Sequence, residues 1–485
     1  MAHPDMAAPL ALATPRCRSP DHLVRRALRV LTLLAAFLTL LARSQADEVS
    51  ADGKVHVTYW EKWVGFEADA LHRVIDRFNR SQDRIVVTAF STSSIDRKTI
   101  VATAGGDPPD IAGLWIQNIA QYAEAEALTP LDEFLRTDGL SPAQWLARYQ
   151  PAYARLCTHQ GRVYAAISTP NLITFHWNKT LFREAGLDPE RPPRTLEELR
   201  EYHHRLTRRD PKTGEFTRLG FLPEEPGWWP WIFYPWFGGV LFDGENITLG
   251  ADPRNFAAMR WVADWTRELG VERVQRFKSA FAGQQASSEA AFFSGKVAIT
   301  IHGVYYNNYI RQYKPGLDYG VGPWPEAAPG VTDFAMVEAD MLVIPRGAKN
   351  PRAAWEFIKY LNSYNPRARS LDELEGAELL CYLHQKHSPL RDWSPFFTEH
   401  HPHPHIAMFR ELSASPHAVS APATGIWREY DRELVALFER VRLLVDTPEN
   451  SIRYAHERLT KSWQRYRRSL ERHGQLGSGD AAPTP

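Results

Sequence analysis

Residues 55–115 read VHVTYWEKWVGFEADALHRVIDRFNRSQDRIVVTAFSTSSIDRKTIVATAGGDPPDIAGLW, and this stretch decides the fold class. Alternating β-rich segments predict strands, apolar side chains at helical spacing predict helices, and Gly and Pro mark the breaks. The predicted elements are strands over residues 55–59, 85–90 and 111–114, and helices over residues 66–78 and 95–104. This βαβαβ order predicts a parallel, doubly wound sheet, in which ligands bind beyond the carboxyl ends of the strands.

The α/β pattern continues through the rest of the chain. Thr195 and Glu198 resemble a capping box that opens a helix, and Asp252 with Pro253 opens another. Further predicted elements are strands over residues 297–301 and 341–344 and helices over residues 351–362, 426–444 and 451–471. No internal repeat and no long linker interrupts this pattern. The sequence therefore predicts lobes that are interwoven rather than joined in tandem.

Composition narrows the class of protein. The chain has 485 residues, with 57 Lys and Arg against 57 Asp and Glu, and 44% of its residues are hydrophobic. That apolar fraction excludes a disordered chain, and the balanced charge argues against a basic nucleic-acid footprint. Three Cys are too few for a disulfide scaffold. The unusual feature is 16 Trp, which must either be buried or be used.

The N-terminus resembles a secretory signal peptide. Basic residues precede an apolar run over residues 30–41, and small residues at positions 44 and 46 follow it. We expect residues 1–46 to be removed near Ala46 and the mildly acidic mature chain to be exported. A plain N-terminal anchor is the alternative. A Gly- and Pro-rich tail over residues 471–485 is expected to be flexible, and whether Cys157 and Cys381 pair stays open.

Four stretches together resemble the extracellular carbohydrate-binding proteins of ABC importers, a maltose-binding-protein-like family. The stretches are AGGDPPDI at 104–111 leading to Trp115, WNKTLFREAGLD at 177–188 with PRTLEEL at 193–199, FSGKVAITIHG at 293–303, and NPRAAWEFI at 350–358. Each motif is weak alone, but their order matches the family across nearly all of residues 55–470.

The resemblance implies a two-lobed α/β fold with a doubly wound sheet in each lobe and three hinge crossovers. The crossovers would fall near residues 168–171, 322–332 and 388–393. Lobe 1 would comprise residues 50–168 with 330–388, and lobe 2 residues 172–322 with 394–470. The cleft between the lobes would close over a sugar by hinge motion. The resemblance also implies a periplasmic monomer that delivers this sugar to importer membrane subunits, without nucleic acid, cofactor or catalysis.

The chemistry of sugar binding points to particular loops. Aromatic rings cover the apolar faces of a sugar, and amide, carboxylate or hydroxyl groups satisfy its hydroxyls. Residues 60–63, 226–239 and 302–308 have this composition, and the second loop carries four Trp within residues 228–236. Its prolines argue against an ordinary helix or a central strand. We expect one or two of these four Trp in the cleft and the rest in the core.

By resemblance, Trp115 and Trp427 match aromatic residues of the family's cleft. Asn171 and Tyr305 stand where maltose-binding protein has Glu and a stacking Trp, which puts maltose specificity in doubt. For Asp340, a role in the cleft and a role as a cap are both open. The candidate ligand-binding residues are Trp60, Trp63, Trp115, Asn171, Trp229, Trp231, His302, Tyr305, Asp340 and Trp427. No catalytic and no metal-binding residue is predicted.

The histidine tract at residues 400–405 has two interpretations. Alternate histidines on an extended segment can bind a metal, whereas a solvated surface loop between helices is the simpler alternative. Motifs for nucleophilic, zinc-protease, phosphate-loop or dinucleotide chemistry are absent from the sequence.

Three functional hypotheses follow. The first is a sugar-binding protein of an importer, and the alternative is a secreted carbohydrate-active hydrolase or lyase. The third is a binding protein for a polyamine or metal chelate. It would need a cluster of acidic or Tyr residues, and the sequence shows no clear one.

Overall fold

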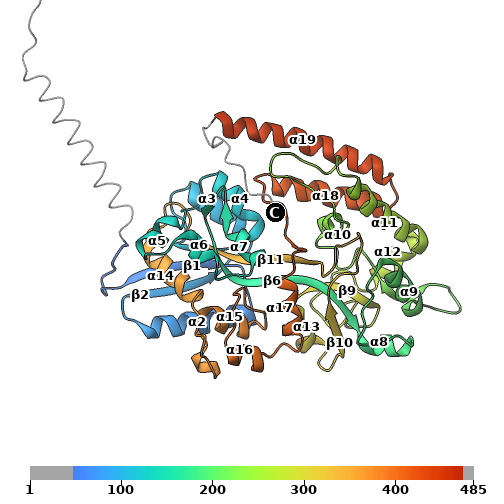
Figure 1. Ribbon diagram of the computed structural model, residues 1–485, viewed down its shortest axis with the longest axis horizontal. Coiled ribbons are helices and arrows are strands. Elements are labelled where there is room, and N and C mark those ends of the chain that lie inside the picture. The colour runs from blue at the N-terminus through green and yellow to red at the C-terminus, as the bar shows by residue number, and fades with distance from the viewer. Residues whose placement is uncertain (1–46, 473–485) are drawn as a thin grey trace, which may run out of the picture. The chain divides into compact units, whose positions relative to one another are not determined.

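The computed structural model describes residues 47–472 (Figure 1). The predicted signal peptide with its cleavage near Ala46 lies outside these residues, as does all of the predicted tail except residues 471 and 472, which end a helix. Within the described part, no helix combines the length and the apolar character that a membrane span requires.

The strands are β1 (Val55–Glu61), β2 (Ile85–Ser91), β3 (Ile111–Trp115), β4 (Thr158–His159), β5 (Arg162–Val163), β6 (Ala166–Asn178), β7 (Arg208–Arg209), β8 (Phe216–Phe221), β9 (Val297–Gly303), β10 (Tyr319–Gly322), β11 (Ala335–Val343) and β12 (Ala418–Val419). The 3-10 helices are η1 (Ile116–Asn118), η2 (Arg155–Cys157), η3 (Pro230–Ile232) and η4 (Leu371–Glu373).

The α-helices are α2 (Phe66–Ser81), α3 (Ile95–Ala104), α4 (Ile119–Glu124), α5 (Asp132–Thr137), α6 (Pro142–Leu146), α7 (Pro151–Ala154), α8 (Lys179–Glu184), α9 (Leu196–Leu206), α10 (Phe233–Trp236), α11 (Pro253–Leu269), α12 (Val271–Ser279), α13 (Tyr306–Tyr313), α14 (Pro351–Leu361), α15 (Gly376–Leu383), α16 (Pro395–His400), α17 (Ile406–Ser413), α18 (Trp427–Arg442) and α19 (Pro448–Arg472).

The predicted βαβαβ unit is confirmed. β1 pairs in parallel with β2 on one side and β3 on the other, and α2 and α3 form the crossovers. Two predicted helix starts are also confirmed. The Thr195 hydroxyl accepts a hydrogen bond from the Glu198 backbone N–H at 3.2 Å, at the start of α9. Asp252 caps α11 in the same way, with Pro253 in its first turn.

Ten of the described strands form one sheet, with the main order β2-β1-β3-β11-β6-β9-β8-β7, and β10 pairs with β6 and β12 with β11 beside this path. The strands β4 and β5 form a separate two-stranded sheet. β11 is antiparallel to β3 and to β6, and β6 is antiparallel to β9. β6 crosses from the region of β1, β2 and α2 to the region of β9, α8 and α13 (Figure 1). The sheets that we expected in separate lobes are therefore continuous through β6 and β11.

Two clusters of buried apolar side chains flank this crossing. One gathers around β1, β3, α14 and α15, and the other around β8, β9, α11 and α18. Adjacent residues of the crossing strands belong to different clusters, with Leu172 in the first and Ile173 in the second. The first expected crossover, at residues 168–171, lies inside β6, while the residue bounds of the lobes stay a prediction.

Two open questions from the sequence have structural answers. Cys157 and Cys381 are both buried free thiols, and burial raises the pKa of each. The histidine tract joins α16 to α17 but packs against the protein instead of extending into solvent, because His403 is 1% exposed and His405 Nε2 lies 3.0 Å from the Tyr319 carbonyl. Within residues 47–472, no group of three or more His, Cys, Asp or Glu side chains is arranged to hold a metal.

Candidate ligand-binding site

A cavity of about 100 Å³ lies between residues of both expected lobes. Its walls come from the segment after β3, from β11, from the Pro- and Trp-rich loop before α10, and from the first turns of α18. Its lining residues are Ile116, Gln117, Trp228, Trp229, Trp231, Val337, Glu338, Ala421, Trp427 and Asp431. Four indoles and two carboxylates therefore face one small space, and none of these lining residues is basic.

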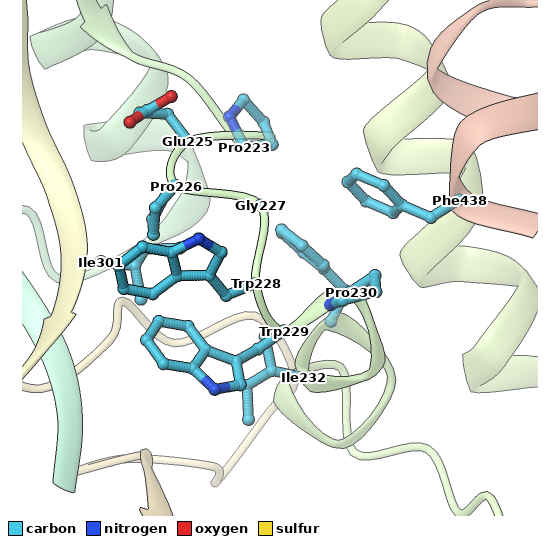
Figure 2. Close-up of a pocket in the computed structure, with 11 residues that line it drawn as sticks. Pro223, Glu225, Pro226, Gly227, Trp228, Trp229, Pro230, Ile232, Ile301 and Phe438 are labelled. Atoms are coloured by element: carbon cyan, nitrogen blue, oxygen red, sulfur yellow. The ribbon is translucent and has the colours of Figure 1, made fainter. Parts of the chain in front are cut away.

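The Trp-rich loop forms a firmly supported wall. Figure 2 shows the indoles of Trp228 and Trp229 on the same side of the loop, and their centroids lie 5.4 Å apart in an edge-to-face arrangement. Trp231 packs edge-to-face on Trp427 at 5.9 Å. The space enclosed by the loop, Ile301 and Phe438 has a cavity of only about 10 Å³. Trp231 and Trp427 are each 4% exposed, so close packing holds these two indoles in place, whereas Trp228 is 48% exposed.

Glu338 on β11 is the carboxylate that the wall engages directly. Trp229 Nε1 donates to its Oε1 at 3.1 Å, and Asn171 Nδ2 on β6 donates to its Oε2 at 3.2 Å. Burial raises the pKa of Glu338 to about 7, although the Trp229 hydrogen bond acts in the opposite direction. No basic side chain in the described chain forms an ion pair with this carboxyl, which explains why burial dominates.

Asp431 lies one helical turn after Trp427, on the same face of α18. In the described part of the chain its carboxylate has neither a hydrogen bond nor an ion pair, and burial raises its pKa. Asp431 and Glu338 thus bring two carboxyl groups without a basic partner to the cavity, one from α18 and one from β11.

A second charged group lies beside the cavity and is neutralised internally. Lys62 Nζ lies 2.9 Å from Asp340 Oδ1, and Lys386 Nζ lies 3.4 Å from Asp340 Oδ2. Burial alone would raise the pKa of Asp340, but the two ammonium groups hold it well below its usual range. The additional carboxylates are Glu61, 3.0 Å from Lys62, and Glu67, 3.3 Å from Lys386. We call Glu61, Lys62, Glu67, Asp340 and Lys386 the lysine cluster.

Two aromatic side chains cover the lysine cluster. The Lys62 ammonium lies 5.2 Å from the Trp115 ring centroid and 5.4 Å from that of Trp63. Trp115 is 38% exposed at the end of β3, so one part of its ring is free for a ligand. Trp63 is 5% exposed and packs on His384 at 4.5 Å. Trp63 therefore supports the cluster from the inside.

His302 and Tyr305 stand behind the cavity wall. His302, at the end of β9, stacks on Tyr306 at 3.6 Å and meets the edge of Trp228 at 5.4 Å. Burial lowers its pKa well below the usual range, so it is neutral at pH 7. Burial and then the nearby Glu338 carboxyl raise the pKa of Tyr305. A Cβ atom at Gly303 would lie 2.3 Å from Asn171 Oδ1 and 2.5 Å from Tyr305 Cε1, so a larger residue there would displace these two side chains.

Comparisons with known proteins give the family. A family model described as bacterial extracellular solute-binding protein matches residues 67–364. The chain belongs to this family. It is 23% identical over 373 residues to the sn-glycerol-3-phosphate-binding periplasmic protein UgpB of Salmonella paratyphi A (strain ATCC 9150 / SARB42), covering 73% of this chain and 77% of that relative.

Solved structures show that the solute-binding fold is shared. The structure described as CpMnBP1 with mannotriose bound has a TM-score of 0.70 and 24% identity, covering 83% of this chain and 99% of that chain. A cyclic alpha-maltosyl-1,6-maltose binding protein from Arthrobacter globiformis has a TM-score of 0.63 and 20% identity, covering 85% of this chain and 100% of that one. These similarities establish the two-lobed fold of this solute-binding protein.

The ten sequence-predicted residues fall into three groups in this solute-binding protein. Those that line the cavity or contact its lining are Trp229, Trp231, Trp427, Asn171 and His302, where His302 does so through Trp228. Tyr305 lies near enough to Glu338 for that carboxyl to raise its pKa. Those at the lysine cluster are Trp63, Trp115 and Asp340. Trp60 belongs to neither group.

The structure places Trp60 in a separate cavity of about 370 Å³, beside His56 and Asp110. The reason is the two-residue period of a strand, which turns Trp60 to the face opposite Glu61. The Trp-rich loop also differs from expectation, because Trp228, Trp229 and Trp231 all line the inter-lobe cavity while Trp236 is buried in the core.

Sequence reasoning did not identify the two cavity carboxylates or the two lysines. Glu338 lies two residues before Asp340 on one strand and therefore shares its face. Asp431 follows Trp427 at a helical spacing of four residues. These two spacings were readable signals, whereas the position of Lys386 depends on contacts with distant segments.

Proposed function

We propose that this solute-binding protein captures a sugar in the cavity between its lobes and delivers it to the membrane subunits of an ABC importer. It works as a monomer in the periplasm and performs no reaction. The observation that carries this proposal is a cavity lined by four indoles and two carboxylates. Indoles cover the apolar faces of a sugar ring, and carboxylates accept hydrogen bonds from its hydroxyls.

The names of related proteins support a small polar solute. The solved structures above are described with mannotriose or with a cyclic maltosyl-maltose, and UgpB is named for glycerol 3-phosphate. A phosphate ester requires a free cation or a set of backbone donors. Lys62 and Lys386 are bound by three carboxylates, and the cavity lining adds two more acidic groups. This charge distribution favours a sugar over a phosphate ester.

The size of the cavity favours the smaller of the sugars that we considered. Pockets for drug-sized ligands span roughly 300–1,000 Å³, whereas this cavity has about 100 Å³. A modified monosaccharide fits this space better than an oligosaccharide, which would require the lobes to move apart.

A thermal-shift screen tests the proposal, with titration calorimetry on each hit. The panel contains mono- and oligosaccharides together with glycerol 3-phosphate. We expect a sugar to raise the melting temperature and the Trp115→Ala variant to bind that sugar at least about tenfold more weakly, because the exposed indole at the cleft is lost. If glycerol 3-phosphate binds and no sugar does, the proposal is wrong. Chromatography of the incubated sugars detects turnover, and products would favour the hydrolase alternative.

A further inference from the structure

The inter-lobe cavity has the chemistry of a cation site. Four indoles line it, its two carboxylates have no basic partner among the described residues, and its lining contains no Lys or Arg. Cations are attracted to the faces of Trp rings, and aromatic cages of this kind bind ammonium groups. We propose that the cavity receives the protonated amine of an amino sugar, an inference that rests on the proposed function and names its substrate class.

The first argument is the electrostatics of the empty cavity. Glu338 and Asp431 approach the same space from β11 and α18, and neither has an ion-pair partner in the described chain. Burying a charge without a partner is costly, and two like charges in one site increase that cost. A ligand ammonium between them supplies the missing positive charge and removes both penalties.

The second argument is that the protein's own lysines cannot supply this charge. Lys386 Nζ is enclosed by Glu67, Asp340 and the Thr169 hydroxyl at 3.3, 3.4 and 3.1 Å. Lys62 is held between Glu61 and Asp340 and covered by indole rings. Moving either ammonium to Glu338 would leave Asp340 partly unpaired in a buried position, which is strongly unfavourable. The lysine cluster is therefore a closed unit beside the cavity.

The third argument is the orientation of the hydrogen bonds at Glu338. The Trp229 N–H and the Asn171 amide each donate to one carboxylate oxygen. Two donors on a carboxylate favour and position its ionised form. Each oxygen retains a second acceptor direction, and a three-donor ammonium can use it. A neutral hydroxyl offers only one donor and no charge.

The test uses matched sugars and the full mature protein. Titration calorimetry compares D-glucosamine, D-galactosamine and D-mannosamine with their N-acetyl forms and with glucose, galactose and mannose. Each set differs only in whether an ammonium, an amide or a hydroxyl stands at one carbon. We expect at least one amine to bind at least about tenfold more tightly than both of its neutral counterparts, as hydrogen bonds to charged groups exceed neutral ones.

Variants assign that preference to the cavity. Glu338→Gln and Asp431→Asn keep the side-chain shape and remove one charge each. Each should weaken binding of the neutral sugars, which lose a charged acceptor, and should weaken amine binding by at least about fivefold more than that. Glu429→Gln removes a charge from an exposed position on the same helix and serves as the matched control. Circular dichroism melting checks that each variant is folded.

The outcomes separate this inference from the proposed function. Equal or tighter binding of neutral sugars, or an amine preference that survives both cavity variants, overturns the inference and leaves a sugar-binding protein. Binding confined to neutral oligosaccharides of the wider screen does the same. If no saccharide in either panel binds, the proposed function fails and the inference fails with it.

Discussion

Replacement of Glu338 by Gln should stabilise the ligand-free protein increasingly as the pH rises. Burial raises the pKa of Glu338 to about 7 from an ordinary value of 4.5. Between these two values the folded protein retains a proton that the unfolded chain has lost, so the contribution of this group to the free energy of unfolding falls as the pH rises. A shift of this size corresponds to about 3 kcal/mol of destabilisation once both states are ionised.

The magnitude depends on pH in a way that can be measured. Linkage gives a cost for Glu338 of about 2 kcal/mol at about pH 6 and about 3 kcal/mol at about pH 8. Gln removes this cost, but its amide group faces one of the two donors, Trp229 or Asn171, that the carboxylate accepted. That mismatch lowers stability by a constant amount, because none of the groups involved titrates in this range. The difference between variant and parent should therefore grow by about 1 kcal/mol from about pH 6 to about pH 8.

Urea unfolding followed by tryptophan fluorescence measures the free energy of unfolding of both proteins at each pH. Taking the difference cancels the buried histidines, which are common to both. Glu457→Gln, at an exposed position on α19, is the control and should show no growth beyond about 0.5 kcal/mol. If the difference in free energy of unfolding stays constant or shrinks towards the higher pH, the reasoning is refuted. Such a result would mean that the pKa of Glu338 is not raised in the folded protein.

Three further predictions address the wall, the contact between lobes and the core. Trp229→Phe keeps an aromatic ring but removes the donor to Glu338, so calorimetry should show about five- to tenfold weaker sugar binding, and an unchanged affinity would disprove a role for that hydrogen bond. Arg428 on α18 forms an ion pair with Asp96 on α3 at 2.5 Å, and the two residues belong to opposite expected lobes. Arg428→Ala should therefore raise the Kd for the sugar by about two- to fivefold, although Arg428 does not line the cavity. The exposed Arg432→Ala is its control, and equal Kd values in all three proteins would contradict a role for this pair in closure. Burial lowers the pKa of four histidines to about 3 from 6.5, so their contribution to stability is complete above about pH 6.5 and is lost as the pH falls towards 3; these are His176, His203, His387 and His401. Urea titrations should show uptake of at least about two protons on unfolding at about pH 5.5, and a flat profile would show that these rings are solvated.

The parts of the fold that depend on local pattern were predictable. The βαβαβ unit and the caps of α9 and α11 follow from periodicity and from capping residues within a few positions. β11 was predicted too short, as residues 341–344 instead of Ala335–Val343. The polar side chains of Glu338 and Asp340 interrupt its apolar run, and the strand forms because β3 and β6 pair with it from both sides. The N-terminal half of this central strand was therefore missed, because its polar residues break the apolar pattern that predicts a buried strand.

The site residues also separate into those that local sequence made predictable and those that depend on contacts between distant segments. Aromatic residues on loops were visible in the sequence because Trp beside Pro and Gly is unusual, and most of them lie at the cavity or the lysine cluster. The carboxylates were not visible, because acidic residues are common and only the pairing of Glu338 with Asn171 across β11 and β6 gives one of them a place in the cleft. Trp60 shows the converse case, in which composition suggested a role in the cleft but strand alternation places the side chain in a different cavity.

Charge recognition and closure use the same elements. Glu338 lies on β11, which pairs with β3 and with the crossing strand β6, and Asp431 lies on α18, beside the Arg428 contact to the opposite expected lobe. In an empty cleft these carboxylates repel, and an open arrangement separates them. An ammonium placed between them converts that repulsion into two attractions that exist only when the walls are close. Such a ligand binds the closed state more tightly than the open one, and this difference in affinity is what can drive closure. A neutral sugar of the same shape leaves the repulsion in place, so the cleft that selects an amine also closes on it most completely.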